Sequence, residues 1–196
     1  MMKTLKVIIV PLWIAAFAAV ACIKKSMDNE AHPPMQYTYL NDLEIRAMEY
    51  SHLDIDGNGT VDFTFHTQLI GDPVLKQDRR QFMVGSKIET NLLNNKSDES
   101  PKLAKGDRIG AKQEGYNWYE ISSVVLTEKV IPSEGNIVWR GLWKSANHNY
   151  LPVQLVKGGK VYHGWIELSF STDSERLILH KAAICTESNS EIKAGF

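Results

Sequence analysis

The sequence predicts an all-β fold, an antiparallel β-sandwich that follows an N-terminal signal peptide and a short flexible tether. Residues 61–70 alternate apolar and polar side chains, which is typical of a strand with one buried face. Short β-rich runs then recur at hairpin spacing, and turn-forming stretches separate them. No segment has the period of a long helix. Many short strands without long helices favour a sandwich.

The strands expected after residues 61–70 share a high content of β-branched and aromatic residues, and they cover 81–84, 88–93, 119–125, 136–143, 151–156, 161–170 and 177–185. One hairpin is especially clear, because Gly158-Gly159 lies between two of these runs and glycine adopts positive φ without steric cost. Residues 94–105 have few apolar side chains and are expected to form an exposed loop, with room for a short helix.

The first 22 residues carry a targeting pattern. Lys3 and Lys6 form a basic start, an apolar run follows from Val7 to Ala21, and small residues precede Cys22. This pattern resembles a bacterial lipoprotein signal peptide. The resemblance implies that Cys22 carries lipid as a thioether and becomes the first residue of the mature chain. An ordinary secretory signal cleaved after Ala21 is the alternative. A membrane-spanning anchor is disfavoured, because the apolar run is shorter than the ~20 residues that span a bilayer.

The predicted organisation is a signal peptide over 1–21, a lipidated tether over 22–36 and a β-sandwich domain over 37–196. The tether is polar and interrupted by prolines, so it has nothing to bury. We expect the protein in the cell envelope, held by the lipid on Cys22 at the outer membrane of a Gram-negative-type bacterium. The sequence leaves both the periplasmic and the surface face open.

Composition limits the partners. Removing 21 of the 196 residues leaves 175, enough for one domain with a sizeable core. Removal of two lysines from the 22 basic residues leaves 20 against 23 acidic ones, a net charge of about −3 with no basic patch. Nucleic acid is therefore not expected as a partner. Attachment to the membrane would come from the lipid alone.

The second cysteine, Cys185, lies in the run Ala182-Ala183-Ile184-Cys185. If Cys22 carries lipid, Cys185 has no disulfide partner within the chain. Its neighbours favour a small buried hydrophobic side chain over a reactive thiol.

Residues 54–62 match the start of a calcium-binding loop. The stretch reads Asp54-Ile-Asp56-Gly-Asn58-Gly-Thr60-Val-Asp62 and follows the pattern D-x-D-x-N-G-x-x-D. Calcium prefers hard oxygen ligands, and alternate residues of a tight loop can bring their oxygens to one ion. We expect side-chain oxygens from Asp54, Asp56 and Asn58, the carbonyl of Thr60, and Asp62 directly or through water.

The match stops at the twelfth position, where a helix-loop-helix calcium site carries a bidentate Glu and this chain has Phe65. A strand follows the loop, so we expect it to cap a hairpin. Without that carboxylate the affinity should be on the order of 10⁻⁴ to 10⁻³ M. The alternative is a metal-free turn whose aspartates bond to local backbone amides.

Several short motifs occur in order along the chain, namely Leu53–Phe65, Leu103–Ile109, Tyr162–Ser169 and Glu191–Gly195. Together they resemble poorly characterised secreted β-sandwich domains of bacterial cell surfaces. That resemblance implies a β-sandwich at the envelope and no established activity. His163 departs from the Tyr-Gly-Trp pattern but leaves the strand intact.

Aromatic residues raise a carbohydrate hypothesis. Trp139 and Trp143, four residues apart among polar neighbours, are the best candidates for a ligand-binding platform, although tryptophans in sandwiches usually belong to the core. Glycan binding through them requires at least one to be exposed.

Enzyme signatures are absent: there is no G-x-S-x-G, H-E-x-x-H or P-loop, and no catalytic residue is predicted. His52 and His66, with Glu49 nearby, could imitate a metal or acid-base site, which is the weaker interpretation.

The sequence therefore predicts a non-catalytic binding or structural lipoprotein stabilised by calcium, with a glycan or protein ligand. A polysaccharide-binding module is the alternative, and a glycan hydrolase comes third. Hydrolysis requires two carboxylates that face each other across a groove.

Overall fold

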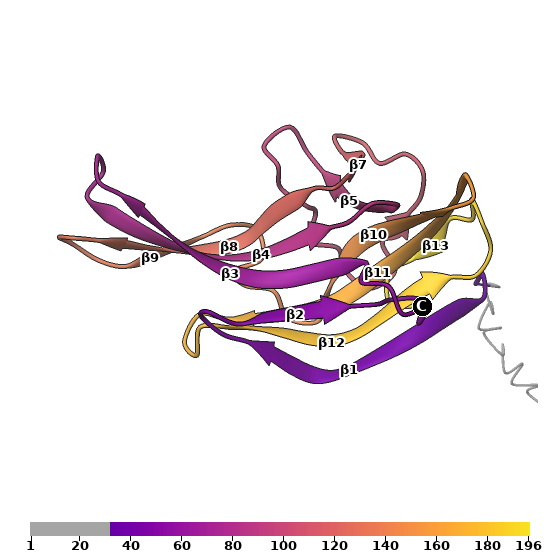
Figure 1. The fold of residues 1–196 in the computed structure, drawn as a ribbon, viewed down its shortest axis with the longest axis horizontal. Helices are drawn as coiled ribbons and strands as arrows, with labels where there is room; N and C mark the ends of the chain where they lie inside the picture. The colour runs from indigo at the N-terminus through magenta and orange to yellow at the C-terminus, as the bar shows by residue number, and fades with distance from the viewer. Residues whose placement is uncertain (1–31) are drawn as a thin grey trace, which may run out of the picture. The chain divides into compact units, whose positions relative to one another are not determined.

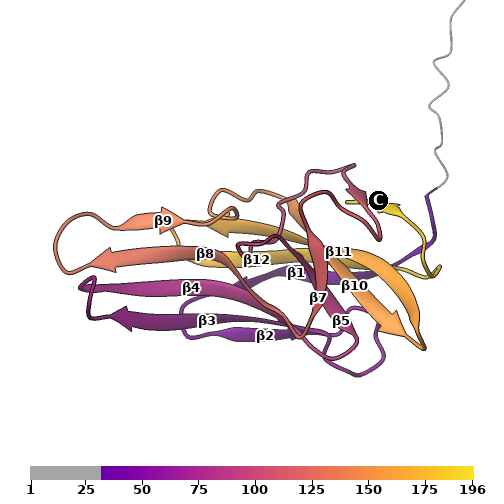
Figure 2. The same cartoon turned by 90° about the horizontal axis from the view of Figure 1, so that it is seen from above.

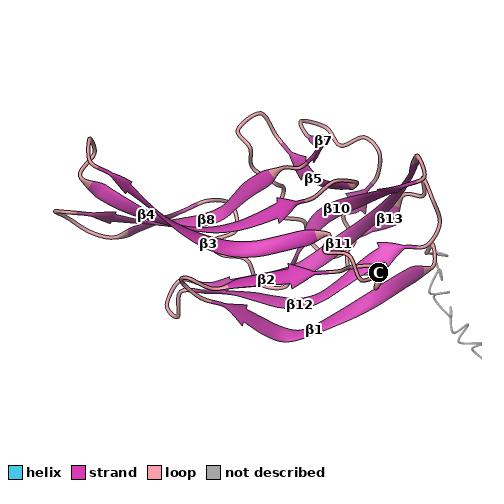
Figure 3. Cartoon of the chain, in the orientation of Figure 1, coloured by secondary structure: helices cyan, strands magenta, loops and turns pink. Residues whose placement is uncertain are grey.

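The computed structural model describes residues 32–196, and this part of the chain contains strands and loops but no helix (Figure 3). The signal peptide, the lipidated Cys22 and the tether as far as residue 31 lie outside the described residues. Within residues 32–196 no helix could cross a membrane.

The strands of the described range are, in chain order, β1 (Met35–Ile45), β2 (Tyr50–Leu53), β3 (Phe63–Asp72), β4 (Gln77–Ser86), β5 (Thr90–Asn94), β6 (Arg108–Ile109), β7 (Asn117–Glu120), β8 (Ser123–Pro132), β9 (Val138–Arg140), β10 (Asn149–Lys157), β11 (Lys160–Ser171), β12 (Arg176–Cys185) and β13 (Ile192–Lys193).

Two main antiparallel sheets pack against each other (Figures 1 and 2). One has six strands in the order β1-β12-β11-β10-β5-β7, and the other has five in the order β2-β3-β4-β8-β9. A small ladder, β13-β6, accompanies them. The predicted fold class, an all-β sandwich, is confirmed.

The main core lies between the two sheets, and alternation along the strands builds it. In β3, Phe63 and Phe65 are fully buried, while Thr64 and His66 point the other way. The same pattern fails at the outer end of this strand, where Leu69 is exposed. Here the β3–β4 hairpin extends beyond the opposite sheet (Figure 1), which is consistent with the exposure of Leu69.

The predicted hairpin around Gly158-Gly159 is confirmed. β10 and β11 pair from Asn149↔Leu168 to Lys157↔Lys160, and both glycines have positive φ, 55° and 74°. Positive φ at both central residues is the conformation of a two-residue turn that matches the twist of the flanking strands.

Two local expectations were wrong, and the strand expected over 136–143 is limited to β9. Residues 119–125 are not one strand, because the chain turns at Ile121 (φ 50°) and passes from β7 in one sheet to β8 in the other. Residues 94–105 contain no helix, and only part of this loop is exposed. Ser100, Pro101 and Leu103 are buried, since the loop packs over Trp143 and Tyr150.

A second, smaller core lies on the outer face of the six-stranded sheet. Trp165 and Tyr150 form its centre, with their rings edge to face at 5.2 Å. Cys185 is buried there, and this burial raises the pKa of its thiol. Its predicted place as a small buried side chain is confirmed, and a raised pKa disfavours the reactive thiolate.

A buried polar chain connects this region to the neighbouring strands. His163 Nδ1 lies 2.7 Å from the Ser190 carbonyl oxygen, and its Nε2 lies 3.2 Å from Gln154 Nε2. Gln154 Oε1 in turn accepts a hydrogen bond of 2.6 Å from Asn91. These contacts fit a neutral imidazole that donates from Nδ1 and accepts at Nε2. Burial lowers the pKa of His163, against weaker opposing contributions from Ser190 and Glu191.

His163 should therefore make stability depend on pH. As pH falls below about 6.5, histidine in the unfolded chain takes a proton that the buried His163 resists. The contribution of His163 to stability is present above that pH and is lost progressively as pH falls further. We expect urea unfolding at pH 7.5 and 5.5 to show a larger loss for the native chain than for His163→Gln. An equal loss would contradict the prediction.

Candidate functional site

The loop of residues 54–62 connects β2 and β3, which pair from Leu53↔Phe63 to Tyr50↔His66. It caps this hairpin, as the sequence predicts. The Ile55 side chain is fully buried in the main core and anchors the loop. From β1, Gln36 and Thr38 donate hydrogen bonds of 2.7 and 3.1 Å to the carbonyls of Asp56 and Ile55. Contacts with the core and with β1 therefore fix the position of the loop.

Three carboxylates converge in this loop. Asp54, Asp56 and Asp62 each offer one oxygen atom, and these atoms lie within 4.8 Å of one another. Among the described residues, no other group of three or more His, Cys, Asp and Glu meets this criterion for a metal site. The Asp56 and Asp62 carboxylates are also shielded from solvent, with the Asp56 side chain 3 % exposed and Asp62 4 %.

Hydrogen bonds from backbone N–H groups to side-chain oxygens shape the loop. Asp54 accepts from the N–H groups of Gly59 (2.7 Å) and Asn58 (3.1 Å), and Asn58 Oδ1 accepts from Thr60 N–H (2.7 Å). Gly57 and Gly59 have φ of 70° and 87°, which favours glycine at both positions. These are the bonds of the predicted metal-free turn, and they coexist with the convergence of the carboxylates.

The cluster has unusual electrostatics. Burial raises the pKa of Asp62 to about 6; the Ile55 N–H opposes this shift, and the nearby Asp56 and Asp54 charges add to it. Burial acts to raise the pKa of Asp54 as well. Hydrogen bonds, led by the one from the Gly59 N–H, outweigh this effect and lower the pKa of Asp54. Carboxylates held together in this way repel each other when ionised, and a bound cation relieves that repulsion.

Lys157, at the end of β10, forms an ion pair with Asp56. Its ammonium group neutralises part of the cluster and would compete with a metal ion for the same oxygen. Phe65, at the position of the missing Glu, is fully buried in the core and has no oxygen to offer. The loop therefore has fewer protein ligands than a helix-loop-helix calcium site.

A cavity of about 320 Å³ opens beside the loop. It is lined by Asn58, Thr60 and Asp62 from the loop, and by Glu89, Thr90 and Lys157 from neighbouring segments. Two predicted ligands outside the carboxylate group, Asn58 and Thr60, thus lie on the same side as Asp62. The cavity leaves space on the Asp62 side of the carboxylate group.

The structure places the two tryptophans of the predicted platform differently. Trp143 is 1 % exposed, and its indole N–H donates a hydrogen bond of 3.1 Å to the Ser100 carbonyl. Trp139 is half-buried and packs against Phe170 (5.2 Å) and Phe82 (6.2 Å) between ring centres. The expectation that Trp143 presents a face to a sugar is corrected, because the turn after β9 carries it into the core.

The histidines flanking the loop do not assemble with Glu49 into a site. His52 Nδ1 contacts Thr64 Oγ1 at 3.1 Å, and its ring lies beside Tyr50. Glu49 instead accepts a hydrogen bond from the Arg46 backbone N–H. In the β2–β3 register, His52 pairs with Thr64, and His66 pairs with Tyr50.

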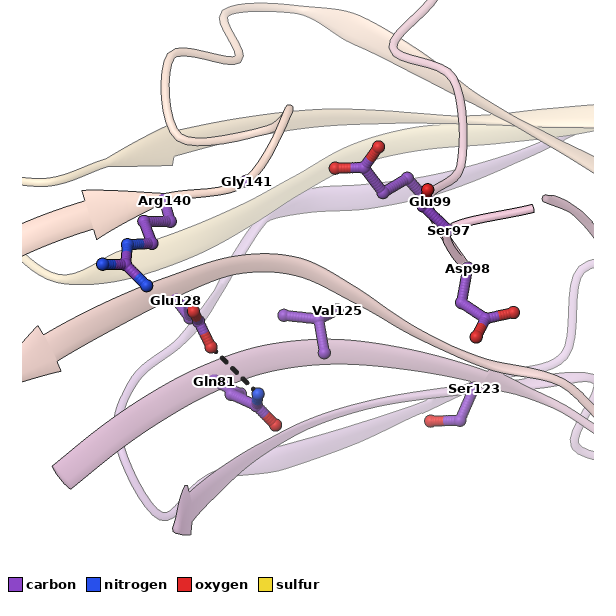
Figure 4. Close-up of a pocket in the computed structure, with 9 residues that line it drawn as sticks. All are labelled: Gln81, Ser97, Asp98, Glu99, Ser123, Val125, Glu128, Arg140 and Gly141. Carbon is purple, nitrogen blue, oxygen red and sulfur yellow. Dashed lines mark hydrogen bonds between the residues drawn. The ribbon is translucent and has the colours of Figure 1, made fainter. Parts of the chain in front are cut away.

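A further cavity of about 430 Å³ lies where β4 and β8 meet the loop after β5. Figure 4 shows Glu128 on one side, hydrogen-bonded to Gln81 at 3.0 Å, with Asp98 and Glu99 on the other. Sequence reasoning missed this cavity, because its carboxylates come from segments about 30 residues apart and no local motif joins them. Carboxylates thus lie on both sides of the cavity, and among the described residues no hydrogen bond or ion pair joins Glu128 to Asp98 or Glu99.

Fold and loop together define an all-β, sandwich-like domain with an acidic group that could hold a metal ion. Comparison of the chain with models of protein families, with characterised proteins and with solved structures gave no match. The fold class and the loop are therefore the features from which a function can be argued.

Proposed function

We propose that this protein is a lipid-anchored protein of the cell envelope whose β-sandwich binds one calcium ion in the loop of residues 54–62. The observation that carries the proposal is the convergence of the Asp54, Asp56 and Asp62 carboxylates within 4.8 Å. The N-terminal pattern ending at Cys22 supports the lipid anchor.

The chemistry of the loop favours calcium over softer metals. All of its candidate ligands are oxygen atoms, from Asp54, Asp56, Asn58, Thr60 and Asp62, and calcium takes six to eight such ligands in a flexible arrangement. Zinc would favour histidine and cysteine, and neither residue type occurs in the loop. The cavity beside Asp62 leaves room for water ligands.

The ion stabilises the fold or supports the binding of a glycan or protein partner. An ion at this position would link Asp54 at the start of the loop to Asp62 at its end, and would hold the β2–β3 hairpin against β1 through Gln36 and Thr38. Because Phe65 supplies no carboxylate and Lys157 competes for Asp56, we expect a dissociation constant on the order of 10⁻⁴ to 10⁻³ M.

Calcium should stabilise the folded protein. With that affinity, 10 mM calcium adds about 1.4 to 2.7 kcal/mol to the free energy of unfolding, which raises the melting temperature by several degrees. The measurement is thermal unfolding of the full-length protein in detergent at pH 7.5, where Asp62 is ionised, with EDTA, calcium or magnesium. An identical melting temperature with EDTA and with calcium would refute calcium binding.

Variants sharpen this test. Asp56→Ala should abolish the calcium-dependent shift, whereas Asp173→Ala, at an exposed turn far from the loop in sequence, should retain it. Lys157→Met removes the competing ammonium group and should shift the calcium titration to lower concentrations. If Asp56→Ala responds to calcium like the native chain, the ion binds elsewhere and the loop is only a turn.

A further inference from the structure

A cluster of polar side chains lies on the six-stranded sheet away from the calcium loop. His180 in β12 is at its centre. Its Nε2 lies 2.7 Å from Ser169 Oγ in β11, and its Nδ1 lies 2.6 Å from Asp42 Oδ1 in β1. A serine, a histidine and a carboxylate are thus joined in one chain of hydrogen bonds across three adjacent strands.

The directions of these bonds are mutually consistent. A carboxylate can only accept, so Asp42 fixes the His180 proton on Nδ1 and leaves a lone pair on Nε2. That lone pair accepts the Ser169 hydroxyl proton. Ser169 Oγ also accepts a hydrogen bond of 2.9 Å from the His148 backbone N–H. The neutral histidine is thereby held in the tautomer that can remove a proton from serine.

The backbone departs from regular pairing at this point on both sides of His180. In β1, the three residues 40–42 lie opposite His180 alone, because Tyr39 pairs with Lys181 and Leu43 with Leu179. In β11, no residue lies opposite His180, since Glu167 pairs with Lys181 and Leu168 with Leu179. Bulges of this kind redirect side chains and are frequent beside active sites.

Two residues of the cluster have strained backbone conformations. Asp42 and His148 have φ of 55° and 51°, in the left-handed region. The His148 ring stacks on His180, with ring centres 4.1 Å apart, and its Nδ1 contacts Glu167 at 2.8 Å. Strain of this kind persists only where surrounding contacts maintain it. In this cluster the left-handed conformations place Asp42 and the His148 N–H beside His180 and Ser169.

We propose that Ser169 is an activated nucleophile for acyl transfer from neutral carboxylic esters, with His180 as general base. Ser169 Oγ attacks the ester carbonyl carbon while its proton passes to His180 Nε2. The ester C–O bond then breaks, and His180 returns the proton to the leaving alkoxide. Water then attacks the acyl carbon while its proton passes to His180 Nε2, the bond between that carbon and Ser169 Oγ breaks, and His180 returns the proton to Oγ, which releases the acid and restores Ser169.

Asp42 is a positioning residue, because it acts on the substrate only through His180. The carboxylates of Asp42 and Glu167 also make the cluster unfavourable for anionic esters, which is why neutral ones are assigned. Ser169 is only 8 % exposed, so small acyl groups should react best. The proposal does not depend on calcium.

The test is covalent labelling of the full-length protein in detergent with a small alkyl fluorophosphonate, followed by peptide mass spectrometry and a time course. We expect an adduct on Ser169. Ser169→Ala should lose it, and His180→Gln should slow labelling by about 10² to 10⁴-fold. Ser171→Ala is the matched control, since Ser171 lies on the same strand and bonds to Ser174 instead, and it should label like the native chain.

Asp42 needs a measurement that folding alone would not change. Asp42→Asn should slow labelling through loss of the correct tautomer at an unchanged melting temperature, because Asn also adopts the left-handed conformation of Asp42, and Asp42→Glu should recover part of the rate. Turnover of 4-nitrophenyl acetate should follow the same order of variants. If the folded native protein gives no Ser169 adduct, or if His180→Gln labels as fast as the native chain, the cluster is only a polar network.

Discussion

Replacement of Trp143 by alanine is expected to lower the free energy of unfolding by about 3 to 5 kcal/mol. The indole is 1 % exposed in the main core, and its removal would leave a cavity that the surrounding strands cannot fill. The Ser100 carbonyl would also lose the hydrogen bond from the indole N–H. Trp143 N–H bonds to the Leu126 carbonyl through the backbone, and this contact would remain.

Urea unfolding of the full-length protein measures this loss. Trp139→Ala is the matched control, because Trp139 is half-buried and its loss exposes less of the core. We expect it to cost less than half as much as Trp143→Ala. Binding assays with a polysaccharide panel on the same two variants address the alternative function. A Trp143→Ala protein that keeps its stability but loses glycan binding would contradict the assignment of Trp143 to the core.

The second large effect is expected at Gly164, in the middle of β11. A Cβ atom there would lie 2.5 Å from the Ala183 carbonyl oxygen and 2.8 Å from Ile184 Cδ1. β12 provides both atoms, and the carbonyl belongs to the backbone of a paired strand, so it cannot move without disturbing the ladder. We expect Gly164→Ala to cost about 3 kcal/mol, at the upper end of overpacking effects.

Gly85→Ala, in β4, provides the comparison. Its nearest neighbours would be 3.8 and 4.0 Å from the new Cβ, which is ordinary van der Waals contact. A strand glycine with free space should tolerate alanine, with a change within about 1 kcal/mol in either direction. Urea midpoints of the two variants should therefore differ clearly. Equal midpoints would show that β11 and β12 can separate at low cost.

Local patterns predicted the features that depend on nearby residues. Alternation in residues 61–70 identified β3, and Gly158-Gly159 identified the β10–β11 hairpin, because strand faces and two-residue turns are determined by adjacent residues. The loop of residues 54–62 was predicted for the same reason. Its three carboxylates lie within nine residues, so a turn suffices to bring them together.

Other predictions were wrong because tertiary packing overrides the local sequence pattern. Residues 119–125 have strand-forming composition throughout, yet the chain must change sheets at Ile121. Trp143 has polar neighbours in sequence, as an exposed residue would, but the turn after β9 directs it inward. Polar neighbours are a property of the local sequence around Trp143. Its burial depends on which other segment packs over it, and here that segment is the loop containing Ser100.

Residues close together in the chain encode the all-β class, the main hairpins, the acidic loop and the targeting pattern that ends at Cys22. Folding is needed to pair Lys157 with Asp56, to place Asp98 and Glu99 in one cavity with Glu128, and to bring Asp42 to His180. Partners such as Asp42 and His180 are 138 residues apart. Strand order and bulges bring such residues into contact, and neither is encoded in a local spacing.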